Sequence, residues 1–138
     1  MKTNENCIFC KIIAGEVPAD KIYEDEDVVA FMDIRPVSRG HALVVPKVHS
    51  DDFLSTNDEV LEAMIPKIKK LAQGVMRAMV AEGINISTNH GLAAGQSVFH
   101  LHFHLIPRFA KDGLEPWPHM ESEPKSRAEI AEFIKKNL

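Results

Sequence analysis

Short apolar segments in the first part of the chain predict β-strands. Lys21–Glu24 and Val28–Asp33 flank an acidic turn, and the β-branched run His41–Pro46 follows a loop delimited by Pro36 and Gly40. β-branched and aromatic residues favour strands, whereas Pro and Gly interrupt them. Strands at such short spacing predict an antiparallel meander.

A helical periodicity follows between Asp51 and Ala81, where apolar residues recur every three or four positions. This is the spacing of one helix face, so the segment predicts a long amphipathic helix that stops near Gly83. Pro66 lacks a backbone donor, and we expect it to kink or split this helix. The methionines of the stripe indicate core packing rather than a cofactor site.

The remainder of the chain predicts two further strands and a second helix. Ile84–Thr88 and Val98–Pro107 have strand character and are separated by the loop Asn89–Ser97. Phe109–Glu123 is irregular, and Ser126–Lys136 predicts a short helix. For the apolar segment 7–14 we predict only that it ends in a turn. The order indicates an α+β fold: an antiparallel five-stranded sheet, one long helix and a short C-terminal helix.

Length and charge narrow the class of protein. With 138 residues, we expect a single domain spanning 1–138. The net charge of −4 disfavours an extended nucleic-acid groove, so no nucleic-acid partner is expected. The polar N-terminus lacks a signal-type apolar stretch, and no run approaches membrane-spanning length. We therefore expect a cytoplasmic protein without a membrane partner.

Alternating histidines carry the chemistry of the fifth predicted strand. Side chains alternate between the faces of a strand, which places His100, His102 and His104 on one face. The residues that enter the core are Leu101, Phe103 and Leu105. A merely solvated face would not need histidine at every polar position. Two functions remain, which can coexist: metal binding and nucleophilic catalysis at phosphorus.

The only two cysteines, Cys7 and Cys10, form a C-x-x-C pair. Without a secretory signal, a structural disulfide is the weaker interpretation, and a metal or redox role is the stronger. A redox motif of this kind typically opens a helix in a βαβ unit, which the meander does not offer. A structural zinc ion would need two more nitrogen or sulfur ligands.

Residues His100–Ile106 fit the pattern His-φ-His-φ-His-φ-φ, where φ is apolar, at every position. The chain thus resembles the histidine triad (HIT) superfamily. The flanking segment 95–98 and Pro107-Arg108 also resemble common members, as do segments 7–13 and 30–34. The resemblance runs from about Cys7 to Arg108 and leaves residues 109–138 as a variable tail, apart from a Trp-Pro pair.

The resemblance implies a HIT-like fold and chemistry at the α-phosphate of a nucleotide. His102 would be the nucleophile that forms a nucleotidyl-histidine, and His104 and Ser97 would bind the phosphate or the leaving group. Asp33 would pair with the ribose hydroxyls and Asn89 would contact the phosphate region. The complete set expected to contact nucleotide is Ile8, Phe9, Phe31, Asp33, Ile34, Asn89, Gln96, Ser97, Val98, His102 and His104. The apolar members would wall a nucleobase pocket, although core packing alone also explains them.

The resemblance also implies how the zinc site is completed. Zinc-containing relatives use a histidine after the third strand and the first histidine of the triad, which correspond here to His49 and His100. With Cys7 and Cys10 these would form a structural zinc site, leaving His102 free for chemistry. The remaining histidines receive no role, since a lone loop histidine is usually solvated: His41, His90 and His119.

The resemblance also implies a homodimer, and within the family we predict a hydrolase of purine nucleoside phosphoramidates. The alternatives are a dinucleoside polyphosphate hydrolase, and a nucleotide-binding or scaffold protein with incidental turnover. The triad ends in His104 rather than Gln. This argues against a nucleotidylyltransferase of the galactose-1-phosphate uridylyltransferase type.

Overall fold

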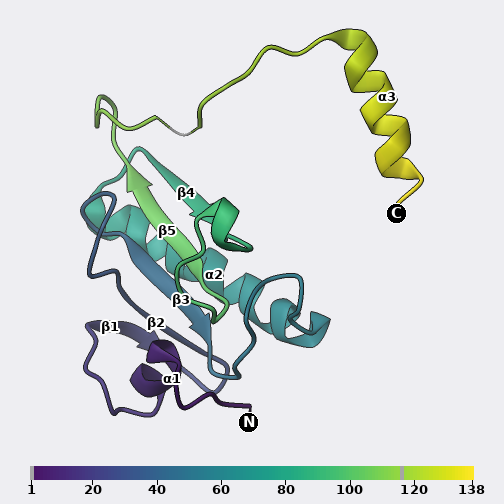
Figure 1. The fold of residues 1–138 in the computed structure, drawn as a ribbon. Coiled ribbons are helices and arrows are strands. Elements are labelled where there is room, and N and C mark those ends of the chain that lie inside the picture. The colour runs from purple at the N-terminus through teal and green to yellow at the C-terminus, as the bar shows by residue number, and fades with distance from the viewer. Residues whose placement is uncertain (1, 116) are drawn as a thin grey trace.

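The strands form one antiparallel sheet in the order β1-β2-β3-β5-β4, which leaves β1 and β4 at its edges (Figure 1). The computed structural model describes residues 2–115 and 117–138. The strands are β1 Lys21–Glu24, β2 Val28–Met32, β3 Ala42–Pro46, β4 Gly83–Ser87 and β5 Phe103–Arg108. The predicted α+β fold with a five-stranded antiparallel sheet is therefore confirmed.

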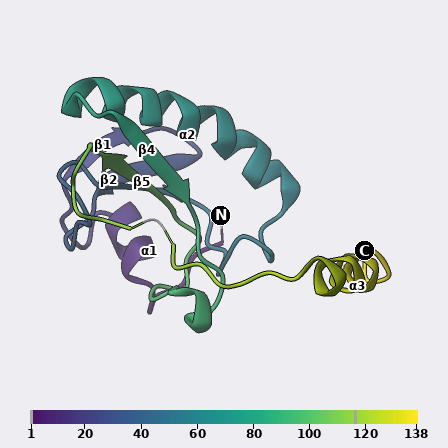
Figure 2. The same cartoon turned by 90° about the horizontal axis from the view of Figure 1, so that it is seen from above.

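Helices cover both faces of this sheet (Figure 2). Helix α2, Asp58–Met79, packs one face with Met64 and Ile68 against Val44 and Leu105. Helix α1, Ile8–Ile13, lies on the other face. Its Phe9 and Ile12 pack on the opposite side chains of the same strands: Val29, Phe31, Leu43 and Val45. Central strands buried on both faces read as continuous apolar runs, which explains why β2 and β3 show no polar alternation.

The helices differ from the sequence expectations in two ways. Of the two effects expected of Pro66, a kink or a split, the split does not occur, because α2 is continuous from Asp58 to Met79 and ends at Val80 in the left-handed conformation, before Gly83. The apolar segment at the N-terminus, for which no helix was predicted, forms α1. Cys7 is its N-cap, and the Cys7 Sγ accepts a hydrogen bond from the Cys10 amide at 3.4 Å.

Strand β5 begins at Phe103, five residues later than predicted. In the preceding segment, side chains rather than a neighbouring strand take up backbone carbonyls. The His102 Nδ1 lies 2.8 Å from the His100 carbonyl, and the Thr88 hydroxyl donates to the His102 carbonyl at 2.8 Å. The predicted alternation of faces nevertheless holds, because Leu101, Phe103 and Leu105 all enter the core against α2.

The segment after β5 leaves the body of the molecule. Its described residues, 109–115 and 117–123, are irregular, as predicted, and position 116 lies outside the described part of the chain. They lead to helix α3, Pro124–Lys135, which stands apart from the sheet and its helices (Figures 1 and 2). A short 3-10 turn, η1, Leu92–Ala94, lies in the loop between β4 and β5. Within the described part of the chain, no helix has both the length and the apolar character that crossing a membrane requires.

Candidate functional site

A pocket of about 520 Å³ opens on the face of the sheet that α1 covers. Such a volume suits a small-molecule ligand. Most of the residues predicted to contact nucleotide line it: Ile8, Phe9, Phe31, Asp33, Ile34, Ser97, Val98, His102 and His104. Phe9 and Phe31 are buried and contact each other edge to face, whereas Ile8 and Ile34 are exposed at the rim. The pocket therefore combines an apolar wall with a polar end.

His102 forms part of this polar end, and its tautomer follows from its hydrogen bond. Its Nδ1 lies 2.8 Å from the His100 carbonyl, which can only accept, so Nδ1 carries the proton. The Nε2 of the neutral ring then holds the lone pair. The ring is further held by edge-to-face contact with Phe9, at 5.2 Å between centroids. His102 therefore has the form that a nitrogen nucleophile requires.

His104 lies beside His102, with ring centroids 5.0 Å apart, and has the opposite tautomer. The Val37 amide donates to Nδ1 of His41 at 3.0 Å, so the proton of a neutral His41 lies on Nε2. That Nε2 lies 2.9 Å from Nδ1 of His104 and 3.4 Å from a carboxylate oxygen of Asp33. His104 Nδ1 therefore accepts, and its Nε2–H is left as a donor.

Burial keeps all three of these histidines neutral. It lowers the pKa of His104 to about 4, with further contributions from His102 and His41. Burial likewise lowers the pKa of His102 and of His41, and the Asp33 carboxylate opposes this effect in both. At neutral pH the site thus holds one acceptor nitrogen on His102 and one donor on His104.

Gln96 organises the loop that precedes the triad. Its side chain accepts from the Gly91 amide at 2.9 Å and donates to the Asp51 carbonyl at 2.6 Å and the Val98 carbonyl at 3.1 Å. The side chain is buried and fully engaged, so it holds the loop in place rather than facing the pocket. Within residues 2–115 and 117–138, the amides of Ser97 and Val98 have no protein acceptor. They are available to an anionic ligand.

Two predicted contacts lie outside the pocket lining. Gln96 is one, and its predicted contact with nucleotide stays a prediction. Asn89 is the other: its Nδ2 lies within 3.5 Å of the position that a Cβ at Gly95 would take. Gly95 itself has a φ of +93°, where side chains are strained. Asn89 thus lies beside the loop that carries Ser97.

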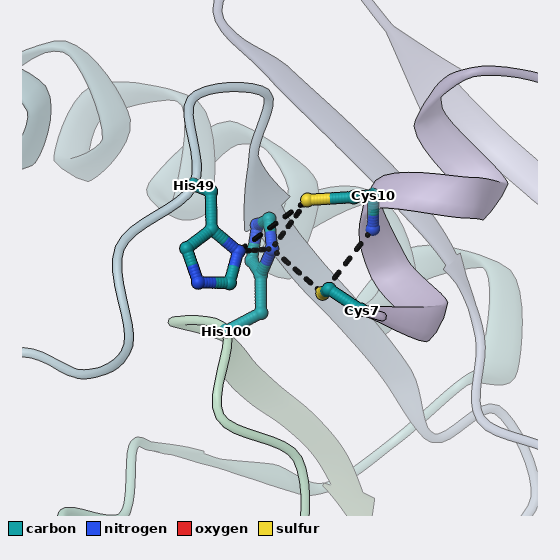
Figure 3. Close-up of side chains that lie close together, drawn as sticks. All are labelled: Cys7, Cys10, His49 and His100. Carbon is teal, nitrogen blue, oxygen red and sulfur yellow. Dashed lines mark hydrogen bonds between the residues drawn. The ribbon is translucent and has the colours of Figure 1, made fainter. Parts of the chain in front are cut away.

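The four residues predicted as metal ligands converge in one cluster, with their ligand atoms within 4.8 Å of one another (Figure 3). Cys7 and Cys10 come from the start of α1, His49 from the loop after β3, and His100 from the segment before β5. All four are buried. The His49 and His100 Nδ1 atoms are 3.1 Å apart. The sulfur-to-nitrogen distances are 3.3 Å from Cys7 to His100, 3.4 Å from Cys10 to His49 and 3.6 Å from Cys10 to His100.

The chemistry of this donor set fits a tetrahedral cation. His49 Nε2 lies 2.9 Å from a carboxylate oxygen of Asp51, and His100 Nε2 lies 2.8 Å from the Pro46 carbonyl. Both Nδ1 atoms therefore present lone pairs to the cluster, with the outer-shell partners usual for metal-binding histidines. Tetrahedral Zn²⁺ would separate ligand atoms by roughly 3.3 Å between nitrogens and 3.6 Å between nitrogen and sulfur. The observed distances are close to these values.

His41 has a structural role in the site that was not predicted from the sequence. It was expected to be a solvated loop histidine, but it is 2% exposed and connects the Val37 amide to His104. Its position at the start of an otherwise apolar strand segment was the available signal, since an unpaired polar group is costly there. His90, by contrast, is exposed and pairs with Asp52 at 3.1 Å.

This chain is similar in sequence and in fold to proteins of the histidine triad family. The HIT domain family model matches residues 14–111. Protein hit of Bacillus subtilis is 47% identical over 111 residues, which cover 80% of this chain and 77% of that protein. A crystal structure from Streptococcus mutans has a TM-score of 0.91 at 40% identity, covering 98% of this chain and 87% of that one. A HIT-family structure from Bacillus subtilis has a TM-score of 0.88 at 42% identity, covering 97% and 98%.

Two further relatives bear on the chemistry. An adenylylsulfatase of Arabidopsis thaliana is 40% identical over 79% of this chain, which spans 55% of that protein. A Zn-bound histidine triad family protein of Mycobacterium smegmatis has a TM-score of 0.76 at 38% identity, covering 95% of this chain and 97% of that one.

Proposed function

This chain belongs to the HIT family of nucleotide-binding and nucleotide-hydrolysing proteins, and on that premise we propose that it hydrolyses purine nucleoside phosphoramidates at the α-phosphate. The reaction proceeds through a nucleotidyl-histidine on His102. The observation that carries the proposal is the tautomer of His102, whose Nδ1–H is held by the His100 carbonyl so that Nε2 is free at the pocket wall.

The residues of the pocket divide the work along a bound nucleotide. Phe9 and Phe31 cover the base, and Asp33 accepts from the ribose hydroxyls. The amides of Ser97 and Val98 donate to the non-bridging oxygens as negative charge builds on them. This local set suits a chain whose net charge is −4 and that therefore offers no general attraction for anions.

The bond changes balance without any external reagent except water. His102 Nε2 forms a bond to the α-phosphorus as the phosphorus–nitrogen bond breaks, and the leaving amine takes up a proton. His104 Nε2–H and the Ser97 hydroxyl are the proton-bearing groups that line this end of the pocket. Water then attacks the phosphorus, breaks the bond to His102 Nε2 and gives one proton back to the group that protonated the amine, which releases the nucleoside monophosphate and restores neutral His102. An amine leaves far more readily when protonated, and this favours the phosphoramidate over a phosphoanhydride.

The buried Cys7/Cys10/His49/His100 cluster would hold zinc as a structural ion. Bound there, the ion supplies a cross-link between α1, the loop after β3 and the segment carrying the triad. His100 serves this cluster through Nδ1 and serves His102 through its carbonyl oxygen. It therefore places the nucleophile and takes no part in phosphoryl chemistry.

A substrate panel with a variant tests the proposal. Adenosine and guanosine phosphoramidates, diadenosine polyphosphates and adenylyl sulfate are compared by kcat/KM, with His102→Ala and, as a control on the exposed tail, His119→Ala. We expect phosphoramidates to be preferred, His102→Ala to lose at least about 1,000-fold in kcat, and His119→Ala to match the parent. Preference for a polyphosphate would support the dinucleoside polyphosphate alternative. Unchanged turnover in His102→Ala would refute the nucleophile assignment.

We also propose that the chain acts as a homodimer in which residues 1–108 form the body and residues 109–138 extend it. An apolar groove of about 590 Å³ lies between α2 and the edge strand β4. Ile65 of α2 and Ile86 of β4, both about half exposed, lie in this groove. Sheet edges with such apolar surroundings are usually covered, and a second copy joined along β4 would cover both.

A further inference from the structure

Helix α3 presents an apolar stripe that nothing in its own chain covers. Ile130, Phe133 and Ile134 lie on one side of the helix, with exposed fractions of 57%, 70% and 53%. Every described residue from Gly113 to Leu138 is exposed. We call residues 109–115 and 117–138 the C-terminal arm. Both views show it carrying α3 clear of the body (Figures 1 and 2).

Hydrogen bonds tie the start of the arm to the body and thereby set its direction. Arg108, at the end of β5, donates two hydrogen bonds to the Asp112 carboxylate, at 2.8 and 3.1 Å. It also donates to the Leu114 carbonyl at 2.7 Å and to the side-chain oxygen of Asn85 in β4 at 2.8 Å. The Asp112 carboxylate in turn accepts from the amides of Phe109 and Leu114. These hydrogen bonds direct the arm past the β4 edge of the sheet.

The position of the arm recurs in solved relatives. The TM-score is an average over the chain, and the arm makes up more than a fifth of it. Scores of 0.91 and 0.88 over 98% and 97% of this chain therefore require the arm to superpose along with the body. A helix of 12 residues has marginal stability in water when isolated. A constant position for such a helix requires a surface outside its own chain.

We propose that the arm docks α3, through Ile130, Phe133 and Ile134, on a second copy of this chain. A second copy accompanies the chain in any organism, as it does in both of those relatives, so it is a surface that all of them share. The arm also extends on the side where the β4 edge and its apolar groove are open to a second copy. The inference goes beyond the proposed activity, because the exchange of arms stabilises the assembly whatever substrate it acts on.

Matched charge substitutions on the two sides of α3 test the docking. Phe133→Glu introduces a carboxylate into the apolar stripe, whereas Ala128→Glu introduces the same charge on the opposite side of the helix. Sedimentation velocity over a dilution series gives the dimer dissociation constant of the full chain. We expect it to rise at least about tenfold for Phe133→Glu and to be unchanged for Ala128→Glu. Circular dichroism and turnover at concentrations that maintain the dimer should match the parent in both.

A photocrosslink decides what the stripe touches. With Ile134→benzoylphenylalanine, irradiation should give a covalent dimer on a denaturing gel. Only intrachain crosslinks, or an unchanged dissociation constant for Phe133→Glu, would overturn the proposal. So would loss of binding to phosphatidylglycerol vesicles by Phe133→Glu with the dimer intact, since the stripe would then belong to a membrane surface. Loss of the dimer in Phe133→Glu alone, together with an interchain crosslink, would establish the docking.

Discussion

At the scale of single residues, one side-chain type performs distinct tasks because its two nitrogens are engaged differently. His49 and His100 use Nε2 for an oxygen acceptor and present Nδ1 to the metal cluster. His102 uses Nδ1 for a carbonyl and presents Nε2 as an acceptor, whereas His104 accepts at Nδ1 and presents Nε2–H. The hydrogen-bond partner of each ring, rather than the residue type, decides the role. A sequence motif that records only histidines cannot show this division.

His41 should therefore act as a positioning residue for His104. We expect His41→Leu, which removes both the acceptor for the Val37 amide and the donor to His104, to lower kcat by about 10- to 100-fold. His41→Gln can still accept at one end and donate at the other, and it should recover part of this loss. Zinc content should be unchanged in both, because His41 is not in the metal cluster. Equal activity of His41→Leu and the parent would show that His41 does not position His104 for the reaction.

The lowered histidine pKa values predict the acid limb of the pH profile. His102 attacks only when neutral, and burial lowers both its pKa and that of His104, the latter to about 4. Protonation therefore begins at a lower pH than the 6.5 of an ordinary histidine. We expect kcat/KM to hold as the pH falls through 6.5 and to decline only at a lower pH, with His104 titrating at about 4. A half-maximum near 6.5 would show that the rings are solvated in the free enzyme.

At the scale of elements, the metal cluster is the joint that connects α1 to the triad. Helix α1 has only six residues, too few to be stable alone, and it covers the pocket face of the sheet. Two of the four ligands sit at its start, Cys7 as its N-cap and Cys10 within it. Removing the cluster should therefore loosen the apolar wall formed by Phe9 as well as the segment carrying His102.

Cys10→Ser tests this joint against Lys11→Ser, which makes a similar change one residue along the same helix. We expect about one zinc per chain in the parent and in Lys11→Ser, and loss of zinc in Cys10→Ser. The unfolding midpoint should fall by at least about 5 °C, and KM should rise as the base wall loosens. Metal analysis and thermal unfolding measure both effects. A parent protein that contains no metal, and whose unfolding midpoint equals that of Cys10→Ser, would contradict the zinc assignment.

The sequence predicted those elements whose signals are local and periodic. The apolar run of β3 and the three- and four-residue spacing of α2 appear in the structure within a few residues. Three features depended on distant residues and were not predicted. Helix α1 is stabilised by packing on β2 and β3, which begin 15 and 29 residues after its last residue. The late start of β5 reflects in part the Thr88 hydroxyl on the His102 carbonyl, 14 residues along the chain, and the role of His41 rests on a contact 63 residues along the chain.

At the scale of the whole molecule, the sheet carries a helix on each face and has two edge strands, β1 and β4. At the β4 edge an apolar groove lies between β4 and α2. His104, the last histidine of the triad, lies in β5, the strand next to this edge. A second copy joined at β4 would therefore stiffen the strand that carries His104.

Ile65→Lys tests that interface independently of the arm. Ile65 is half exposed on α2 and lies in the groove with Lys69 and Arg77. In a two-fold symmetric dimer the same groove faces itself, so one substitution places two new ammonium groups in an apolar interface already bordered by cations. We expect the dimer dissociation constant to rise at least tenfold, with the stability of the monomer little changed. Leu54→Lys, at a 73% exposed position outside the groove, is the matched control.

A parent-like dimer in Ile65→Lys would place the interface elsewhere. If Phe133→Glu alone dissociated the protein, the arms rather than the sheet edge would hold the two copies together.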